Sequence, residues 1–191
     1  MSRSTLTAGA RGSGLTVLGG IATMGLQFIS VAALSRLLTP EDFGLVAMVG
    51  GFVALGNLLR DFGMPMAALQ AKSLTHQQAS TLFWVNASLA SAAALLLTLS
   101  TPLLVILYSE SRLAALVPTM ASVILVTGIG AQIQVDLARR MKFKALVASD
   151  VAAQILALAA AIGLALQGAG YWALVAQALV TAVSALIFRM F

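Results

Sequence analysis

Six apolar stretches, each long enough to cross a lipid bilayer, divide this chain of 191 residues. Short polar connections carry nearly all of its charge. Only 9% of the residues are charged, 60% are hydrophobic, and the mean hydropathy is +1.00. A membrane-spanning helix needs about 20 mostly apolar residues. The predicted spans are, approximately, residues 14–35, 42–59, 80–107, 115–136, 146–166 and 171–188.

The pattern of polarity within these stretches decides between helices and strands. Each strand of a membrane barrel would need about ten residues of alternating polarity, and no such alternation occurs. The sequence therefore predicts an all-α integral membrane protein, in which residues 1–191 form one six-helix transmembrane bundle. Pro102 is expected to kink the third span. The sequence stops soon after the last predicted helix, which suggests one lobe of something larger or a truncated product.

The basic residues predict an orientation, because Lys and Arg collect on the cytoplasmic side of a membrane protein. With a cytoplasmic N-terminus, nine of the 11 basic residues fall inside, and only Arg36 and Arg112 fall outside. The inside residues are Arg3, Arg11, Arg60, Lys72, Arg139, Arg140, Lys142, Lys144 and Arg189. Six spans also return the C-terminus to the cytoplasm. The net charge of +5 then reflects topology, and no nucleic-acid partner is needed to explain it.

Several classes of function find no support in the residues. The chain has no cysteine and a single histidine, His76, so thiolate metal sites are excluded and the histidine cannot build a metal centre alone. There is no nucleophile–base arrangement, no GxxxxGK(S/T) phosphate loop and no HExxH motif. The sequence predicts neither an enzyme nor a bound metal or cofactor.

Polar side chains inside the spans are costly in lipid and usually face the interior of a bundle. They are Gln27, Asn57, Asn86, Gln132, Gln134, Asp136, Asp150, Gln154 and Gln177. Gln132 and Gln134 lie near the predicted inner end of the fourth span and are candidates for substrate binding. For each amide, the alternative is a hydrogen bond to a neighbouring helix.

Two aspartates in this set, Asp136 and Asp150, are candidates for ion coupling. Asp136 belongs to the same polar cluster as Gln132 and Gln134, and Asp150 shares one helix face with Gln154. The alternative is that both aspartates simply pair with the basic residues of the intervening loop.

Three basic residues at the predicted inner ends, Arg60, Arg139 and Arg140, are candidates for binding a phosphate-bearing head group. The planar guanidinium group can bind phosphate through two hydrogen bonds at once. The alternative is that these residues only set the topology, and that Arg60 pairs locally with Asp61.

The two outer arginines lead to different expectations. Arg36 opposes the charge bias and ranks first among the basic residues for binding an anionic ligand, with an ion pair to Glu41 or Asp42 as the alternative. Arg112 lies beside Glu110 in a short outer loop, and no role beyond solvation is expected for it.

Two local patterns concern the helices themselves. Thr39, Pro40 and Asp42 predict a helix start, because they supply a capping hydroxyl, a preset φ angle and an acid near the positive end of the helix dipole. Small residues four positions apart predict close helix contacts in lipid. These pairs are Ala47/Gly51, Gly50/Ala54, Ala87/Ser91 and Ala159/Gly163.

Four segments of the chain resemble bacterial polysaccharide flippases, the oligosaccharide-lipid branch of the multidrug/oligosaccharidyl-lipid/polysaccharide exporter superfamily. They are LSRLLTPEDFG at residues 34–44, DFG at 61–63 followed by ALQ at 68–70, LARRMKFK at 137–144 and GAGYWALV at 168–175. The resemblance covers essentially the whole chain, and the order of the motifs is more specific than any one of them. It is closest to the lipopolysaccharide and colanic-acid exporter subgroup.

This resemblance implies one lobe of a two-lobed transporter of 12 to 14 helices around a central cavity. It implies that an undecaprenyl-pyrophosphate-linked oligosaccharide is moved, without ATP, from the cytoplasmic to the periplasmic leaflet of the bacterial inner membrane. The implied partners are this lipid-linked oligosaccharide, membrane lipid and a second lobe or a dimer partner. A cationic, amide-lined cavity is expected, because sugars and pyrophosphate must be shielded from hydrocarbon.

Two alternatives remain at this point. An ion-coupled exporter of small cationic compounds from the same superfamily would need an acidic residue deep in a span, whereas the acids here lie near the ends of spans. A membrane assembly subunit without transport activity is the second alternative.

Overall fold

The computed structural model describes residues 3–60 and 76–190, and it describes the side chains of residues 17–58 and 80–190. Every regular element in these ranges is a helix. The helices are α1 (Arg3–Leu34), α2 (Pro40–Arg60), α4 (His76–Leu99), α5 (Thr101–Tyr108), α6 (Leu113–Arg139), α7 (Phe143–Leu166) and α8 (Trp172–Met190). Six of the seven are long and apolar enough to cross a membrane. The predicted all-α membrane bundle is therefore confirmed.

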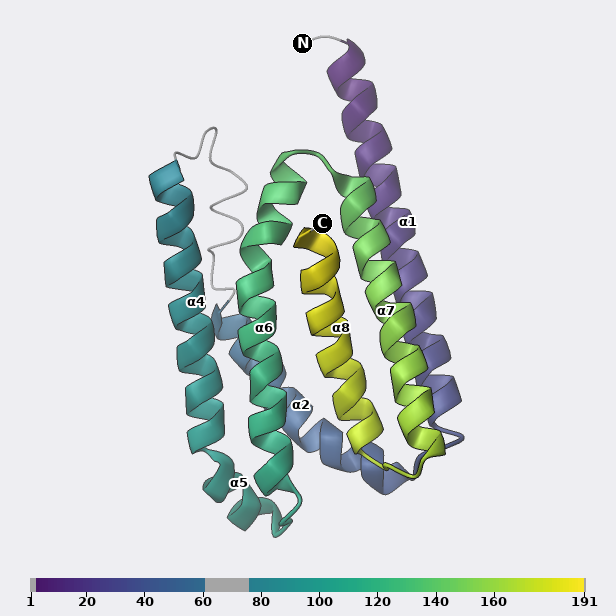
Figure 1. The fold of residues 1–191 in the computed structure, drawn as a ribbon, viewed down its shortest axis with the longest axis vertical. Helices are drawn as coiled ribbons and strands as arrows, with labels where there is room; N and C mark the ends of the chain where they lie inside the picture. The colour runs from purple at the N-terminus through teal and green to yellow at the C-terminus, as the bar shows by residue number, and fades with distance from the viewer. Residues whose placement is uncertain (1–2, 61–75, 191) are drawn as a thin grey trace.

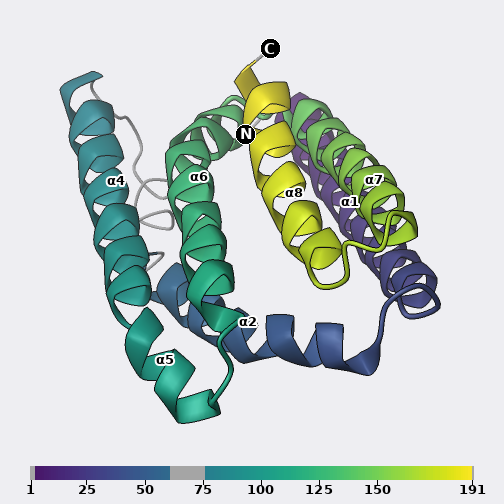
Figure 2. The same ribbon diagram turned by 60° about the horizontal axis from the view of Figure 1, so that its bottom comes forward.

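The helices form a row with one member lying across it. In Figure 1, α1, α7, α8, α6 and α4 lie side by side, and α2 crosses obliquely behind α8 and α6. Figure 2 shows the same crossing, with α2 lying along the bottom of the bundle. Among the described helices, the backbone of α1 lies close to that of α7 alone, whereas the backbone of α2 lies close to those of α4, α6 and α8. Thus α1 and α2 diverge from the turn that joins them.

The third predicted span, residues 80–107, is two helices in the structure. Helix α4 ends at Leu99, and α5 begins at Thr101 with Pro102 in its first turn. Proline lacks an N–H group and clashes inside a helix, but the first turn tolerates it. Pro102 therefore marks a new helix start and not a kink within one helix.

Helix α2 begins where the sequence predicts. The Thr39 hydroxyl accepts a hydrogen bond from the Asp42 N–H at 3.3 Å, and the Thr39 N–H donates to Asp42 Oδ2 at 3.0 Å. This reciprocal pair is a capping box, which satisfies two amides that the first turn leaves without helical partners. The predicted cap is confirmed.

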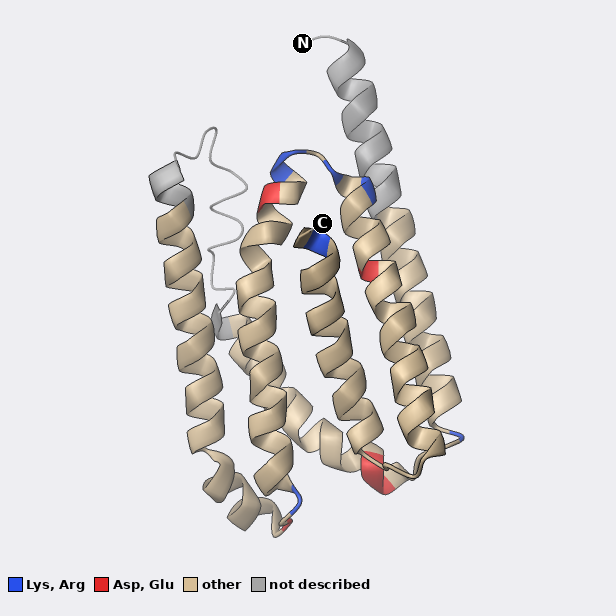
Figure 3. Ribbon diagram, viewed as in Figure 1, with Lys and Arg blue, Asp and Glu red and all other residues tan. Residues whose placement is uncertain are grey.

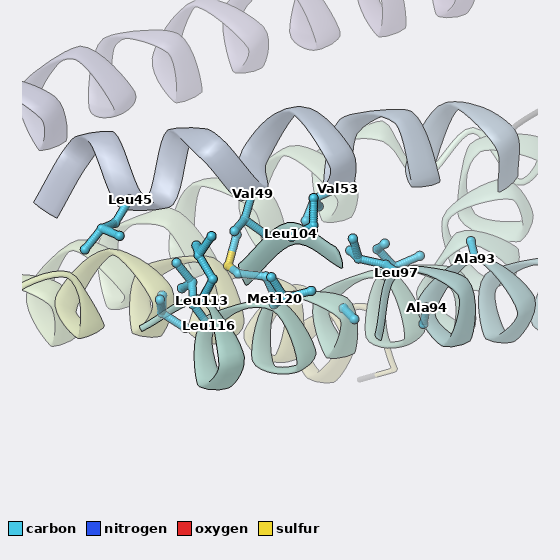
Figure 4. Packing of buried hydrophobic residues seen from close by; sticks show 14 of the residues in the cluster. Leu45, Val49, Val53, Ala93, Ala94, Leu97, Leu104, Leu113, Leu116 and Met120 are labelled. Carbon is cyan, nitrogen blue, oxygen red and sulfur yellow. The ribbon is translucent and has the colours of Figure 1, made fainter. Parts of the chain in front are cut away.

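The larger core cluster lies between α2 and the helices that it crosses. Figure 4 shows Leu45, Val49 and Val53 of α2 beside residues of α4, α5 and α6, including Leu104 and Met120. A smaller cluster combines residues of α1, α7 and α8 with Leu38 of the turn that joins α1 to α2. It consists of Leu34, Leu38, Ala161, Ala165 and Ala173.

The small residues that bring helices together differ from the predicted pairs. Glycines 50, 51 and 163 have nothing within 4 Å of the position that a Cβ atom would take, so the prediction of close contacts at these glycines is wrong. A Cβ atom on Gly19 would instead lie 2.5 Å from Val147 Cγ2, and one on Gly56 would lie 2.8 Å from Ile124 Cδ1. On α7, a buried row of alanines four residues apart supports the packing: Ala153, Ala157, Ala161 and Ala165.

The described charged residues lie toward the two ends of the bundle and leave the middle without charge (Figure 3). The α6–α7 connection and the C-terminal end of α8 lie at the same end of the bundle, which we call the basic end. Its charged residues are Asp136, Arg139, Arg140, Lys142, Lys144, Asp150 and Arg189. The opposite end holds Arg36, Glu41, Asp42, Glu110 and Arg112.

Candidate functional site

A cavity of about 590 Å³ lies between α1, α2, α6, α7 and α8. Four amide side chains line it, one each from α1, α6, α7 and α8: Gln27, Gln134, Gln154 and Gln177. Ser30, Thr127 and Thr181 also line it. Amides inside the spans are expected to face the bundle interior, and Gln27, Gln154 and Gln177 line this cavity.

Helical periodicity explains how α8 presents a polar stripe to this cavity. Gln177, Thr181 and Arg189 are separated by multiples of four residues, so they lie on one face of the helix. The Gln177 amide donates to the Ser30 hydroxyl of α1 at 2.5 Å. This bond links two helices whose backbones are not in contact, and it fixes two polar groups on the cavity wall.

The cavity changes character along its length. At the opposite end, its walls are apolar and include Leu34, Phe43 and Leu174, which also belong to or pack against the smaller core cluster. Toward the basic end, the walls include Gln134 and Arg189. The polar groups therefore lie toward the basic end of a space whose walls near the α1–α2 turn are apolar.

Arg189 holds the polar wall together at the basic end. Its guanidinium donates to Asp150 Oδ1 at 2.6 Å and to Gln134 Oε1 at 3.3 Å. The Arg189 side chain is only 13% exposed, and its Nε atom is buried without a hydrogen-bond partner. The alternative given for Asp150, an ion pair with a basic residue of the α6–α7 loop, is not what the structure shows, because the partner of Asp150 comes from α8.

A second hollow of about 200 Å³ lies beside this group of residues. Gly19 and Thr23 of α1, Val147 and Asp150 of α7, and Gln134 of α6 contribute to its lining. Gln134 lines both spaces. The Arg189–Asp150 ion pair therefore stands between the cavity and the hollow.

The structure separates the remaining candidates of the basic end from the cavity. Asp136 and Arg140 form an ion pair of 2.8 Å one helical turn apart, with side chains 54% and 64% exposed. This pairing of Asp136 with a loop arginine is the alternative that the sequence left open, and it is confirmed. Gln132 and Arg139 are half-buried and do not line the cavity.

The two remaining arginine candidates lie elsewhere. Arg36 is exposed in the turn between α1 and α2, and the side chain of Arg60 lies outside the described residues. The alternative partners of Arg36 are engaged by other groups: Glu41 pairs with Arg112, and Asp42 binds Thr39. The prediction that Arg36 pairs with one of these acids is therefore not supported by the described contacts.

Arg112 is a structural link, and the expectation that it is merely solvated is wrong. It forms ion pairs with Glu110, at 2.9 Å, and with Glu41 at the start of α2. Hydrogen bonds from Arg112 hold the pKa of the Glu110 carboxyl below its usual range, and the same bonds raise the pKa of Arg112. The loop before α6 is thereby tied to α2.

Not every polar residue within the helices contributes to the cavity. The Asn86 amide donates to the Gly128 carbonyl oxygen of α6 at 2.8 Å, which is the interhelical bond given as the alternative for such amides. No cluster of three or more metal-ligating His, Cys, Asp or Glu side chains occurs within the described residues.

Arg189 lines the cavity but is not predicted from the sequence as a site residue. A basic residue near the end of the last helix indicates only the charge asymmetry of the chain. The spacing of Gln177, Thr181 and Arg189 along one helix face is the pattern that could have identified it.

Comparison with known proteins identifies the family of the chain. Residues 33–191 match the model of a family described as polysaccharide biosynthesis protein. The chain belongs to this family. It is 30% identical, over 90% of its length, to the succinoglycan biosynthesis transport protein ExoT of Rhizobium meliloti. It is 25% identical to the lipopolysaccharide biosynthesis protein WzxC of Escherichia coli and to the teichuronic acid biosynthesis protein TuaB of Bacillus subtilis, over 74% and 69% of its length.

These relatives are longer than the chain. The matched regions make up 35% of ExoT, 28% of WzxC and 27% of TuaB, so the chain spans about a third of their length. No solved structure matches it significantly. The family match, the bacterial relatives and the six apolar helices together identify a multi-pass bacterial membrane protein of this family.

Proposed function

We propose that this chain forms the first lobe of a flippase that moves a lipid-linked oligosaccharide across the bacterial cytoplasmic membrane. The observation that carries the proposal is a cavity that gathers four glutamines and an arginine among apolar side chains inside the bundle. Polar groups within a bilayer are costly unless they bind one another or a polar solute. This group of polar side chains therefore suits a polar solute.

The chemistry of the wall suits a glycan. Glutamine amides both donate and accept hydrogen bonds, as sugar hydroxyl groups do. The volume of about 590 Å³ lies in the range of about 300–1,000 Å³ that small-molecule sites occupy. We propose that the cavity receives the saccharide and head-group part of the substrate, while the lipid chain remains among hydrocarbon.

The arrangement of α1 and α2 supports a second lobe or a dimer partner. The backbone of α1 lies close only to that of α7 among the described helices, and α1 diverges from α2 (Figure 1). Both helices contribute residues to the cavity lining. The polar residues that line the cavity on this side would then face lipid, which cannot form hydrogen bonds with them. We propose that the rest of the transporter closes this side, and that the chain acts in transport and not as an enzyme.

Complementation tests the proposed function. In a bacterial strain that lacks its polysaccharide flippase, the chain together with a second lobe should restore surface polysaccharide, measured by glycan-specific staining. The chain alone should not restore it. Restoration by the chain alone, as a monomer, would contradict the requirement for a second lobe.

A matched pair of variants on α7 tests the role of the cavity. Gln154→Leu removes an amide from the cavity wall, whereas Gln167→Leu removes an exposed amide at the end of the same helix. One lost hydrogen bond costs about 0.5–1.5 kcal/mol, so Gln154→Leu should reduce export about 2- to 12-fold at matched protein levels. Equal export by the two variants would argue against the cavity as the substrate site.

The ion pair of Asp150 favours this residue as the candidate for ion coupling. Asp150 pairs with Arg189, which lines the cavity, whereas Asp136 is exposed and pairs with Arg140 outside the cavity. We therefore propose Asp150 as the better candidate of the two. An exporter of small cations is less well supported, because the charged side chain that lines the cavity is an arginine. Efflux of a cationic dye by the assembled transporter, blocked by Asp150→Asn, would favour that alternative.

A further inference from the structure

Arg189 is placed to do more than stabilise the bundle. It is the only charged side chain among the described residues that line the cavity. Its guanidinium donates a short hydrogen bond to Asp150, at 2.6 Å, and a longer one to Gln134, at 3.3 Å, while Nε–H has no acceptor. A buried donor without a partner is costly, so the site has hydrogen-bonding capacity that the protein itself does not use.

We infer that Arg189 binds the phosphate or pyrophosphate group of the transported molecule, and that Asp150 occupies the guanidinium until this group arrives. The inference rests on the proposed function and names the part of the ligand that the basic end of the cavity takes. A guanidinium group binds two phosphate oxygens through parallel hydrogen bonds. The amides beside it can bind the adjoining sugar.

The position of Asp150 makes an exchange of partners feasible. Its side chain is 37% exposed and lines the smaller hollow on the far side of the ion pair. When Arg189 turns to an anion in the cavity, the Asp150 carboxylate still faces that hollow. Asp150 and the ligand therefore compete for one guanidinium.

This competition predicts opposite effects from the two halves of one ion pair. Arg189→Gln removes the binding group and should weaken binding of a pyrophosphate compound about tenfold or more. Asp150→Asn removes the competing charge and should tighten binding several-fold. A pair that only holds α7 to α8 predicts that both substitutions weaken binding or leave it unchanged.

The Asp136–Arg140 pair provides the matched control. It is an Arg–Asp pair at the same end of the bundle, but it is exposed and lies outside the cavity. Arg140→Gln and Asp136→Asn should leave binding of the probe unchanged. An equal loss with Arg140→Gln would show that general positive charge at this end, and not Arg189, attracts the anion.

The experiment measures binding to the purified chain in lipid nanodiscs by isothermal titration calorimetry. The probes are farnesyl pyrophosphate, inorganic pyrophosphate and farnesol. Binding of both pyrophosphate compounds, but not of farnesol, with loss in Arg189→Gln and gain in Asp150→Asn, supports the inference. Preference for farnesyl pyrophosphate over inorganic pyrophosphate would identify a lipid-linked phosphate as the source of the group.

Two results would overturn the inference: a wild-type chain that binds neither pyrophosphate compound, or an Asp150→Asn variant that binds no more tightly. If Arg189→Gln fails to fold, Asp150→Asn alone still decides, because it keeps the arginine. The complementation assay is independent of these measurements. If Arg189→Gln leaves binding of the probes unchanged while the complementation assay still shows export, this inference is refuted and the proposed function stands.

Discussion

At the scale of single residues, Arg112 is the clearest example of a charge with a structural role. It binds Glu41, which lies 71 residues earlier in the chain, and it also binds Glu110. We predict that Arg112→Ala lowers the thermal unfolding temperature in detergent, because α2 loses its tie to the loop before α6. Arg36→Ala, an exposed arginine at the same end, is the control and should leave the unfolding temperature unchanged.

The Glu110 carboxyl makes this link dependent on pH. Hydrogen bonds from Arg112 lower its pKa in the folded chain below the ordinary value of 4.5. A carboxyl of this kind stabilises the fold above its unfolded pKa, and the stabilisation is lost as the pH falls through the lowered pKa. We predict that the unfolding temperature falls less between pH 6 and pH 3 in Glu110→Gln than in the wild type. An identical fall in both proteins would contradict a role for this carboxyl.

At the scale of helices, the sequence predicts interactions between residues within one helical turn, but it does not predict which residues meet between helices. The capping box of Thr39 and Asp42 is predicted correctly, because both partners lie within one turn. The pairs containing Gly50, Gly51 and Gly163 have the right spacing but no close neighbour. Which face of a helix meets another depends on the partner, and four-residue spacing alone does not identify it.

Gly19 provides a test of the contact between α1 and α7. A Cβ atom there would lie 2.5 Å from Val147 Cγ2, whereas one on Gly20 would meet nothing within 4 Å. We predict that Gly19→Ala destabilises the bundle by about 1–3 kcal/mol, the usual cost of overpacking, and that Gly20→Ala does not. Thermal unfolding measures both variants.

A compensating substitution sharpens this test. Val147→Ala removes both methyl groups that the new Cβ would meet, so the double variant Gly19→Ala/Val147→Ala should recover much of the loss. Residues in contact show such non-additive effects. Additive losses in the double variant would mean that the two helices do not meet at this point.

At the scale of the whole molecule, the sequence predicts the kind of site better than its members. Amides inside apolar spans indicate a polar interior, and Gln27, Gln154 and Gln177 line the cavity. Asn86 carries the same chemical group and bonds to a neighbouring helix instead. Residue type cannot separate these outcomes, because the separation depends on where the neighbouring helices lie.

Arg189 shows the same limit for charges. A basic residue near a helix end contributes to topology wherever its side chain points, so the charge count alone conceals its place in the cavity. The ion pair with Asp150 joins residues 39 positions apart. Only the packing of α8 against α7 brings them together.

The orientation of the whole molecule is the last prediction. The basic end carries Arg139, Arg140, Lys142 and Lys144 around the α6–α7 connection, whereas acids accompany the arginines of the opposite end (Figure 3). Because basic loops stay in the cytoplasm, we expect both termini and this connection to be cytoplasmic.

Reporter fusions measure this orientation at three positions. An alkaline phosphatase reporter, which is active only in the periplasm, should be inactive after Lys144 and active after Glu110 and Gly168. Each of these positions lies in or near a connection between helices, so the fusions divide no span in its middle. Substituting the basic residues at 139–144 with glutamine should weaken the difference, because the charges that retain this loop are then gone. Phosphatase activity after Lys144 in the unaltered chain would reverse the orientation, and it would place the Arg189 end of the cavity toward the periplasm.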